Sequence, residues 1–440
     1  MAHLDADELE RFLALLRSED FMVFVQEHQH AYQYRDDFAR EKMPNGLDPA
    51  FMWEFVSFVR RMAGRPLVSE SSANGFRPPT RQSFWTATPA MIAGLNDVVS
   101  RCNDASKLSS SLFRLEARPA IRQLVIEELD AAAFRDGIHV EREALRELLC
   151  DERQPETAEE QVISNAIALM DDIGDHTSKP MDAKELRHLN TQLQAGIGLI
   201  EPRPYHPPTP CMPPELLRGR GKTLEDVARS WEHPCSWGPH PLFDVLLNAD
   251  MIWVDPPFER FAGLTEVLIR WHSYCTVGVP ALRFVPLSRM RLDWERRLVG
   301  PPEAPMRFGE AIVESGFGVD STPYIQQIIR FLNAGLDRVE RIVSRIDEAD
   351  DRCRRLIDQD GRLTLRQKQL LDDLVDDPTR AVDVASYEKR FDVATSTARG
   401  DLVRLVSLNL LSTEFQGKKQ LFRLRPDAPR IISEAAERRG

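Results

Sequence analysis

Residues 384–425 have the sequence VASYEKRFDVATSTARGDLVRLVSLNLLSTEFQGKKQLFRLR. Apolar residues recur at helical spacing over 395–408, which predicts a helix there, and a shorter pattern predicts another over 384–390. After them, alternating apolar and polar residues over 411–413 and 420–424 predict two short strands joined by a tight turn. The stretch is therefore expected to fold as helix, turn, helix and hairpin.

A further helix is predicted just upstream, over 365–374, with Thr364 as its N-cap. Three helices followed by a hairpin form a winged helix-turn-helix, which we place at 361–425 within a C-terminal domain of residues 361–440. In such a module the third helix enters a major groove of DNA and the hairpin reaches the flanking backbone. The residues predicted to touch DNA are Thr395, Ser396, Thr397, Arg399, Lys418 and Lys419.

Charge is unevenly distributed along the 440 residues. The whole chain carries a net charge of −12, which argues against phosphate binding over its whole surface. From Gly361 onward there are 15 Lys and Arg against 12 Asp and Glu, a net of +3. DNA contact is therefore expected only at the C-terminal end. Because +3 is modest, a protein-interaction role for the winged helix stays open.

The rest of the chain is predicted to be mainly α-helical. An amphipathic pattern over 323–358 predicts one long helix, interpreted as a connection between domains because its apolar stripe covers too few heptads for a coiled coil. A dimerising helix, and hence a homo-oligomer, is the alternative. The predicted domains are an N-terminal helical extension at 1–83, a helical body at 84–305, the connecting helix at 320–360 and the winged helix at 361–440.

Several site and compartment classes are disfavoured. The six cysteines form no CxxC, the N-terminal residues lack an apolar signal segment, and no run of about 18 apolar residues occurs, so a cytoplasmic protein without a membrane span is expected. His233, Cys235, His240 and Asp244 match no structural zinc spacing, so no metal is expected. Residues 217–223 end in Gly-Lys-Thr but lack the first glycine of a phosphate loop.

A family resemblance covers residues 84–305. Residues 256–267, PPFERFAGLTEV, align without gaps with the motif HPFxDGNGRxxR, and the flanking segments 165–169, 189–193, 240–242 and 286–288 follow in matching order. The chain thus resembles the Fic (Fido) family, whose members transfer AMP from ATP to protein hydroxyls. The resemblance implies a Fic-like helical bundle, with an N-terminal helical extension and a winged helix as familiar additions.

The motif departs from the family at each group that does chemistry. Pro256 stands where the family has the histidine that takes the proton of the target hydroxyl, and Arg260 stands where an acid holds Mg²⁺. Phe258 matches the family and Gly263 keeps the second loop glycine, but Leu264 replaces a phosphate-binding arginine. The resemblance therefore implies a protein with no intact catalytic residues and no expected cofactor.

Shifting the alignment with the motif by one residue gives a weak substitute site. Asp255 would then stand in for the base and Glu259 for the metal ligand, as in an atypical protein adenylyltransferase that uses ATP and Mg²⁺. This register loses the Pro-Phe match and still lacks both arginines, so enzymatic activity is the alternative hypothesis and not the main one.

Residues 132–137, AAFRDG, occupy the place of the family's inhibitory helix. Asp136 stands where the family has a glutamate that pairs with the motif arginine, and Gly137 follows it. With Leu264 in the arginine's place, an inhibitory ion pair is expected to have no partner for its acid. Asp136 and Gly137 are therefore interpreted as an ordinary helix-ending turn.

Together these patterns predict a DNA-binding regulator or interaction platform that acts through its winged helix and lacks transferase activity. The alternatives are the atypical adenylyltransferase and a protein-interaction module that does not bind DNA. DNA and a protein are the expected partner classes, and no membrane contact is expected.

Overall fold

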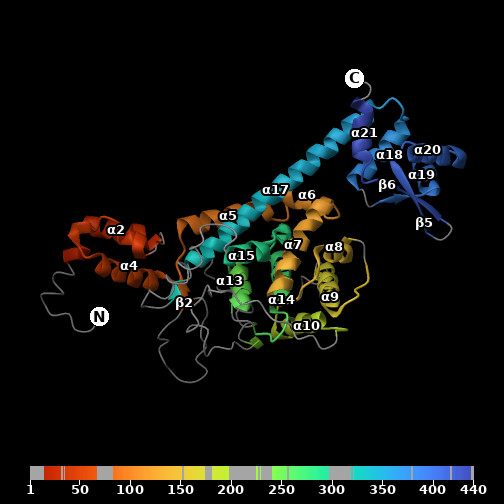
Figure 1. Ribbon diagram of the computed structural model, residues 1–440. Coiled ribbons are helices and arrows are strands. Elements are labelled where there is room, and N and C mark those ends of the chain that lie inside the picture. The colour runs from red at the N-terminus through yellow and green to blue at the C-terminus, as the bar shows by residue number, and fades with distance from the viewer. Residues whose placement is uncertain are drawn as a thin grey trace. The chain divides into compact units, whose positions relative to one another are not determined.

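The computed structural model describes residues 14–30, 33, 35–66, 83–150, 153–173, 181–197, 224–225, 228, 240–254, 257–296, 319–320, 322–377, 380–416 and 419–437 (Figure 1). These residues are mainly helical, with a small antiparallel sheet near the C-terminus, so the predicted fold class is confirmed. The chain divides into two compact units. The first contains Met1–Leu112 and Arg122–Arg338, and the second contains Phe113–Ile121 and Val339–Gly440.

The first unit begins with a helical pair. Helix α2 (Glu19–His30) packs on α4 (Pro49–Ala63), with the short α3 (Arg35–Phe38) and a 3-10 turn, η1 (Pro44–Gly46), between them. The Asp48 carboxylate accepts the Phe51 N–H at 3.3 Å and so caps α4, whose first residue is proline. Buried Phe21, Phe38 and Met52 form the core of this pair.

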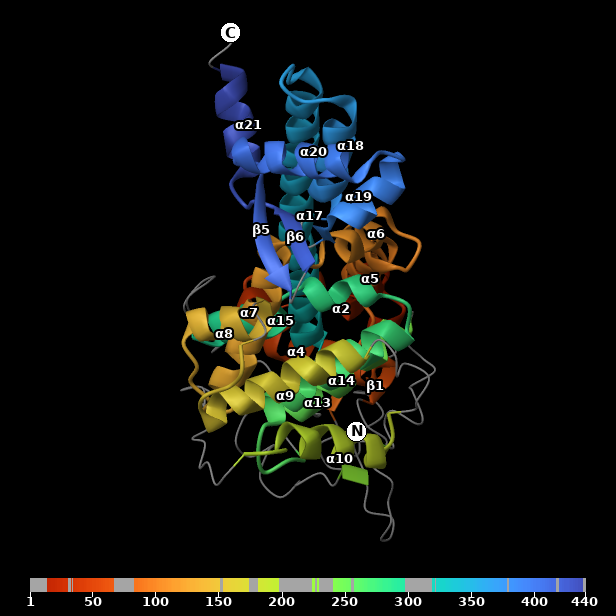
Figure 2. The same ribbon diagram turned by 90° about the vertical axis from the view of Figure 1, so that its right-hand side faces the viewer.

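The body of the first unit is a bundle gathered around one central helix. Helix α14 (Ala262–Thr276) is buried from Gly263 to Tyr274 and contacts α9, α10, α13 and η2 (Figure 2). The other elements are α5 (Pro89–Cys102), α6 (Lys107–Leu115), α7 (Pro119–Arg135), α8 (Arg142–Cys150), α9 (Ala158–Ile173), α10 (Ala183–Leu193), α13 (Pro241–Val254), η2 (Pro280–Phe284) and α15 (Leu287–Glu295).

A small sheet joins distant parts of the first unit, where the sequence predicted only a loop and then helices. Strand β1 (Arg65–Pro66) pairs antiparallel with β2 (Ser83–Trp85), which pairs parallel with β3 (Val319–Asp320). A buried ion pair between Arg60 and Asp320, at 2.9 Å, lies beside this sheet. Strands of two or three residues are too short to carry a periodic signal, so pattern analysis could not find them.

Helix α17 (Thr322–Gln359) matches the predicted helix over 323–358, and the boundary between the two units falls within it. In the first unit, α17 approaches its neighbours closely at two glycines. A Cβ on Gly94 would lie 2.8 Å from Ile329, and a Cβ on Gly335 would lie 2.5 Å from Val285. Glycine at these positions is what lets the helix surfaces come together.

The second unit contains the predicted three helices and hairpin, α18 (Leu365–Asp376), α19 (Val384–Phe391), α20 (Thr395–Ser407), β5 (Leu411–Gln416) and β6 (Lys419–Leu424). Thr364 caps α18 as predicted, in a capping box with Gln367. Two elements were not predicted: strand β4 (Ala381–Val382), which makes a three-stranded sheet in the order β4-β6-β5, and helix α21 (Ala428–Glu437). Leu371, Leu402 and Phe422 lie in the unit's core.

Among the helices of the described ranges, none has the length and apolarity that crossing a bilayer requires.

Candidate functional site

Helix α20 presents an exposed polar first turn. Thr395, Ser396, Thr397 and Arg399 are all exposed, while Ala398 between them is fully buried and anchors the helix in the core. The N-cap residue Ala394 makes no side-chain hydrogen bond to the helix, so the first-turn N–H groups have no side-chain cap. Such a turn offers hydroxyls, backbone donors and a positive helix end to an anionic partner.

A buried polar network holds α20 against the other two helices of the second unit. The Asp401 carboxylate accepts hydrogen bonds from the Tyr387 hydroxyl at 3.0 Å and from the Gln367 amide at 3.1 Å, and it pairs with Arg366 at 3.1 Å. Tyr387 comes from α19, and the other two partners come from α18. Because all three helices meet at one carboxylate, the orientation of the exposed turn of α20 is fixed by the core.

Most arginines of the second unit are engaged by carboxylates of the same unit, but Arg399 is not. Arg366 pairs with Asp401, Arg423 pairs with Glu414, and Arg425 pairs with Asp427. Within the described residues, Arg399 makes no hydrogen bond and no ion pair. Its charge is therefore available to a partner without first breaking an internal contact.

Of the two lysines predicted to contact DNA from the hairpin, the structure describes only one. Lys418 lies outside the described residues. Lys419 is exposed, and its ammonium lies 3.3 Å from the Asp383 carboxylate, which also caps α19. Among the predicted contacts on α20, the Thr395 hydroxyl donates to Glu388 at 2.9 Å. These two side chains thus have internal acidic partners that the sequence did not predict.

The second candidate site is the N-terminus of α14, where the motif-like segment begins the helix. The Asp136 carboxylate, just after the end of α7, accepts the N–H of Gly263 at 2.7 Å and the N–H of Leu264 at 2.8 Å. The sequence did not predict these two backbone hydrogen bonds, which tie the end of α7 to the start of α14. Gly137 does end the helix as expected, with a φ of 74°.

Asp136 is held in a nearly dry environment. Burial raises its pKa to about 7, against the lowering effects of the two backbone hydrogen bonds and of Arg135. A Cβ on Gly263 would lie 2.9 Å from the Ala132 carbonyl and 3.1 Å from the Asp136 carboxylate, so only glycine permits this close approach. The N–H groups of Gly263 and Leu264 are therefore already occupied by a side chain of the same protein.

The residues at the start of α14 leave it without a side-chain cap of its own. Helix α14 starts with Phe261, Ala262 and Gly263, none of which can cap it through a side chain, and Phe261 itself has a left-handed φ of 55°. A buried helix end without its own cap needs an acceptor from elsewhere in the fold. In the fold that acceptor is Asp136, 127 positions before Gly263, and the sequence did not indicate which residue would supply it.

The other motif positions lie around this helix end. Phe258 is half-buried and packs against the core, Glu259 is exposed, and the Arg260 guanidinium lies 5.0 Å from the Phe261 ring centre. Asp255 and Pro256 lie outside the described residues. The structure therefore brings Asp136 to Gly263 and leaves the predicted substitute base, Asp255, untested.

Two of the segments that flank the motif in the sequence meet it in space. The Asn190 side-chain amide donates to the Arg260 carbonyl and to the Thr265 hydroxyl, each at 2.9 Å. The Asn165 amide donates to the carbonyls of Leu193 and Ala195, which joins α9 to the end of α10. The Asn190 amide thus holds the segment before α14, and the Asn165 amide holds the end of α10.

A fully buried charge network, which sequence analysis missed, joins α7, α14 and α15. Arg270 pairs with Glu128 at 2.5 Å and with Glu266 at 2.7 Å, and the Ser288 N–H and hydroxyl both donate to Glu128 at 2.8 Å. The two carboxylates raise the pKa of Arg270 against the opposing effect of its burial. Because every member is enclosed, the network can stabilise the bundle but cannot reach a substrate.

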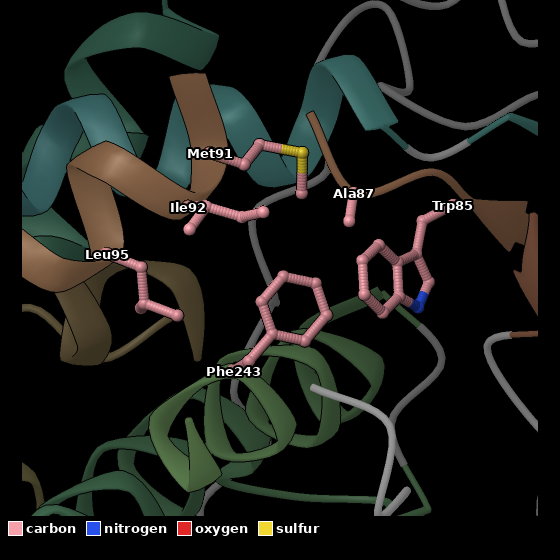
Figure 3. A pocket seen from close by; sticks show the side chains of 6 residues that line it. All are labelled: Trp85, Ala87, Met91, Ile92, Leu95 and Phe243. Atoms are coloured by element: carbon pink, nitrogen blue, oxygen red, sulfur yellow. The ribbon is translucent and has the colours of Figure 1, made fainter. Parts of the chain in front are cut away.

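The remaining candidates do not form a polar site. Within the described ranges no cluster of His, Cys, Asp or Glu could hold a metal ion; the His240 ring accepts the Leu242 N–H, and His233 and Cys235 lie outside these ranges, as do residues 217–223. A small hollow in the first unit has only apolar lining (Figure 3). Its lining residues are Trp85, Ala87, Met91, Ile92, Leu95 and Phe243.

No family model matches the chain, and no curated protein matches it. Among solved structures, the chain is similar to a Fic family protein from Desulfovibrio desulfuricans G20, with a TM-score of 0.44 and 16% sequence identity. The comparison covers 80% of this chain and 99% of that protein.

Proposed function

We propose that this protein is a DNA-binding regulator, in which residues 361–425 act as a winged helix-turn-helix and the Fic-like helical body has lost transferase activity. The observation that carries the proposal is the exposed first turn of α20. There the hydroxyls of Ser396 and Thr397 accompany the guanidinium of Arg399, which has no partner among the described residues. A helix that displays such groups while its other face is locked in the core has the form of a recognition helix.

In the proposed complex, α20 lies in the major groove with its first turn toward the bases. Arg399 donates to a phosphate or to a guanine edge, and the Ser396 and Thr397 hydroxyls and first-turn N–H groups contact phosphate or base acceptors. Asp401 keeps α20 in position through its bonds to α18 and α19. Lys418 and Lys419 supply backbone contacts from the hairpin.

Loss of transferase activity is supported by the N-terminus of α14. Binding of a nucleotide phosphate at a helix N-terminus needs free N–H groups and a matching positive charge. Here the N–H groups of Gly263 and Leu264 bind Asp136, and Leu264 stands where the family resemblance expects an arginine. The body is then free to serve as a sensor or as a platform for a protein partner.

The DNA proposal is tested by titrating the full-length protein into a labelled pool of random-sequence duplexes at several salt concentrations. We expect saturable binding that weakens with salt, because Lys and Arg contacts release counterions from DNA. Arg399→Ala is expected to weaken binding about tenfold and to lower the salt slope by about one.

Arg430→Ala is the matched control. Arg430 is an exposed arginine of α21 in the same unit, paired with Glu434, so the substitution removes the same charge away from the proposed face. It is expected to leave affinity within about twofold, in line with the small effects of exposed ion pairs. Absence of saturable wild-type binding at low salt, or equal losses in both variants, would refute the proposal.

The adenylyltransferase alternative is tested separately with labelled ATP and Mg²⁺. We expect no label on the protein itself or on proteins of a lysate, and no heat of ATP binding by calorimetry. Incorporation that disappears in both Asp255→Ala and Glu259→Ala would instead establish the atypical enzyme.

A further inference from the structure

The exposed face of α20 continues beyond its first turn. Helix positions three and four apart share a face, so Gly400, Val403 and Ser407 continue the line that Ser396 begins. All four residues, called the central strip below, are exposed, and the buried residues of α20 occupy the opposite face. The exposed fraction of Val403 is 52%, and a Cβ on Gly400 would meet nothing within 4 Å. The central strip therefore has polar ends and a small, uncovered apolar middle.

Arginines border the central strip on both sides. Arg399 and Arg404 are five positions apart, and with 3.6 residues per turn they leave the helix at opposite edges of the strip. Arg404 donates one hydrogen bond, to the Arg362 carbonyl at 3.1 Å, and neither arginine of α20 pairs with a carboxylate of the described residues. The single acid of α20, Asp401, is buried. The exposed face of the helix is therefore cationic at both edges.

This distribution of charge matches the major groove of a DNA duplex. The groove is about 12 Å wide, which admits an α-helix of about 10–12 Å in diameter, and phosphates line both of its walls. A helix that enters the groove turns its edges to these phosphates and its middle to the bases. A protein partner is disfavoured, because a stable protein interface buries roughly 800 Å² on each side and this face exposes only one large apolar side chain, that of Val403.

We propose that Val403 is a specificity-determining residue, which contacts the C5-methyl group of a thymine while Arg399 and Arg404 bind phosphates on the two walls of the groove. The inference rests on the proposed DNA-binding function and names the base that α20 reads. Among the four bases of DNA, thymine is the one that presents a methyl group in the major groove, where it meets apolar side chains. Gly400, one turn before Val403, has no side chain and lets the helix come close to the base edges.

The test replaces thymine by uracil, which lacks only the methyl group. The full-length protein first selects duplexes from a random pool, and each invariant thymine of the selected sequences is then replaced in turn by deoxyuridine. For the wild type we expect one such replacement to weaken binding about fourfold, since burial of one methyl group contributes about 0.8 kcal/mol.

Variants of α20 assign this loss to one side chain. Val403→Ala is expected to bind the thymine and uracil duplexes equally well, whereas Val403→Ile, which keeps the methyl groups, should keep the fourfold difference. Arg404→Ala should weaken binding to both duplexes alike, about tenfold, and lower the salt slope by about one, because a phosphate contact carries no base information. Met62→Ala removes an exposed apolar side chain of the first unit and, as the control, should leave binding unchanged.

The failures of the two proposals differ. Saturable wild-type binding with no thymine whose replacement weakens it, or a Val403→Ala variant that still distinguishes the two duplexes, would overturn the role of Val403 and leave the DNA-binding function standing. No saturable binding, including the case in which a protein covers this face instead, would overturn both. Because Val403 is exposed, the thermal midpoint of unfolding should not fall in its variants, and a loss of discrimination that comes with a lowered midpoint would count against the contact.

Discussion

At the scale of single residues, Asp136 shows how the tertiary environment changes the chemistry of a side chain. In the sequence it is one acid at the end of a helix, but in the fold it bridges the end of α7 and the start of α14 through two backbone hydrogen bonds. Full burial raises its pKa from 3.8 to about 7. Its ionised form is therefore the less stable one in the folded protein over the mildly acidic range.

This shift predicts a pH dependence of stability. Because the pKa of Asp136 is higher in the folded protein than in the unfolded chain, the folded protein binds more protons between about pH 4 and 7. The contribution of Asp136 to the free energy of unfolding therefore falls as pH rises through this window, by about 2–4 kcal/mol. Relative to Asp136→Asn, the thermal midpoint of the wild type should fall steadily from pH 4 to 7.

The control for this prediction is Glu54→Gln, which neutralises an exposed carboxyl of the same unit. Its midpoint should follow that of the wild type across the whole range. A wild type and Asp136→Asn variant whose midpoints stay parallel from pH 4 to 7 would contradict the assignment.

At the scale of secondary-structure elements, glycines mark where helices need close contact and where they do not. A Cβ on Gly335 of α17 would lie 2.5 Å from a methyl group of Val285, whereas a Cβ on Gly400 of α20 would meet nothing within 4 Å. Both positions are helical, so both gain the intrinsic helix preference of alanine. Only at Gly335 does close packing oppose the added methyl group of alanine.

Gly335→Ala is therefore expected to destabilise the protein by about 1–3 kcal/mol, the typical cost of overpacking. Gly400→Ala is expected to stabilise its helix by up to about 1 kcal/mol, since alanine restricts the unfolded chain more than glycine does. The midpoints of chemical denaturation of the two variants should move in opposite directions. A shift of the same sign in both would show that the contact at Gly335 is not tight.

At the scale of the whole molecule, the chain has two compact units, each with its own core. The core of the first unit includes Leu264 and Val267 of α14, and that of the second includes Leu402 of α20 and Phe422 of β6. The predicted boundary near residue 361 separated a C-terminal domain from the connecting helix, whereas the boundary between the compact units falls within α17.

Separate cores predict separable unfolding transitions in calorimetry. Phe422→Ala removes a fully buried ring and should lower the transition of the second unit, at a cost of about 3–5 kcal/mol. Leu264→Ala, at a buried position of the first unit, should lower the free energy of unfolding of that unit by about 2–5 kcal/mol. The transition of the second unit should then stay in place. Equal shifts of all heat absorption in both variants would show that the units unfold as one.

Local patterns in the sequence were sufficient to predict α17, the three helices α18 to α20 and the hairpin, but not α21. The apolar stripe of α17, the N-cap at Thr364 and the alternation in β5 and β6 each depend on neighbours within a few positions, so they could be recognised along the chain. The exposed turn of α20 was predicted for the same reason, since buried Ala398 and Leu402 fix which face points outward.

Only the tertiary structure decided which distant groups meet. The contact of Asp136 with the start of α14, the network of Arg270 with Glu128 and the sheet that joins β2 to β3 link residues more than a hundred positions apart, and none of them has a periodic signal. Nor did the sequence predict that Lys419 pairs with Asp383 while Arg399 has no described partner. The physical reason is that burial and through-space charge depend on how the chain closes on itself, which no local pattern records.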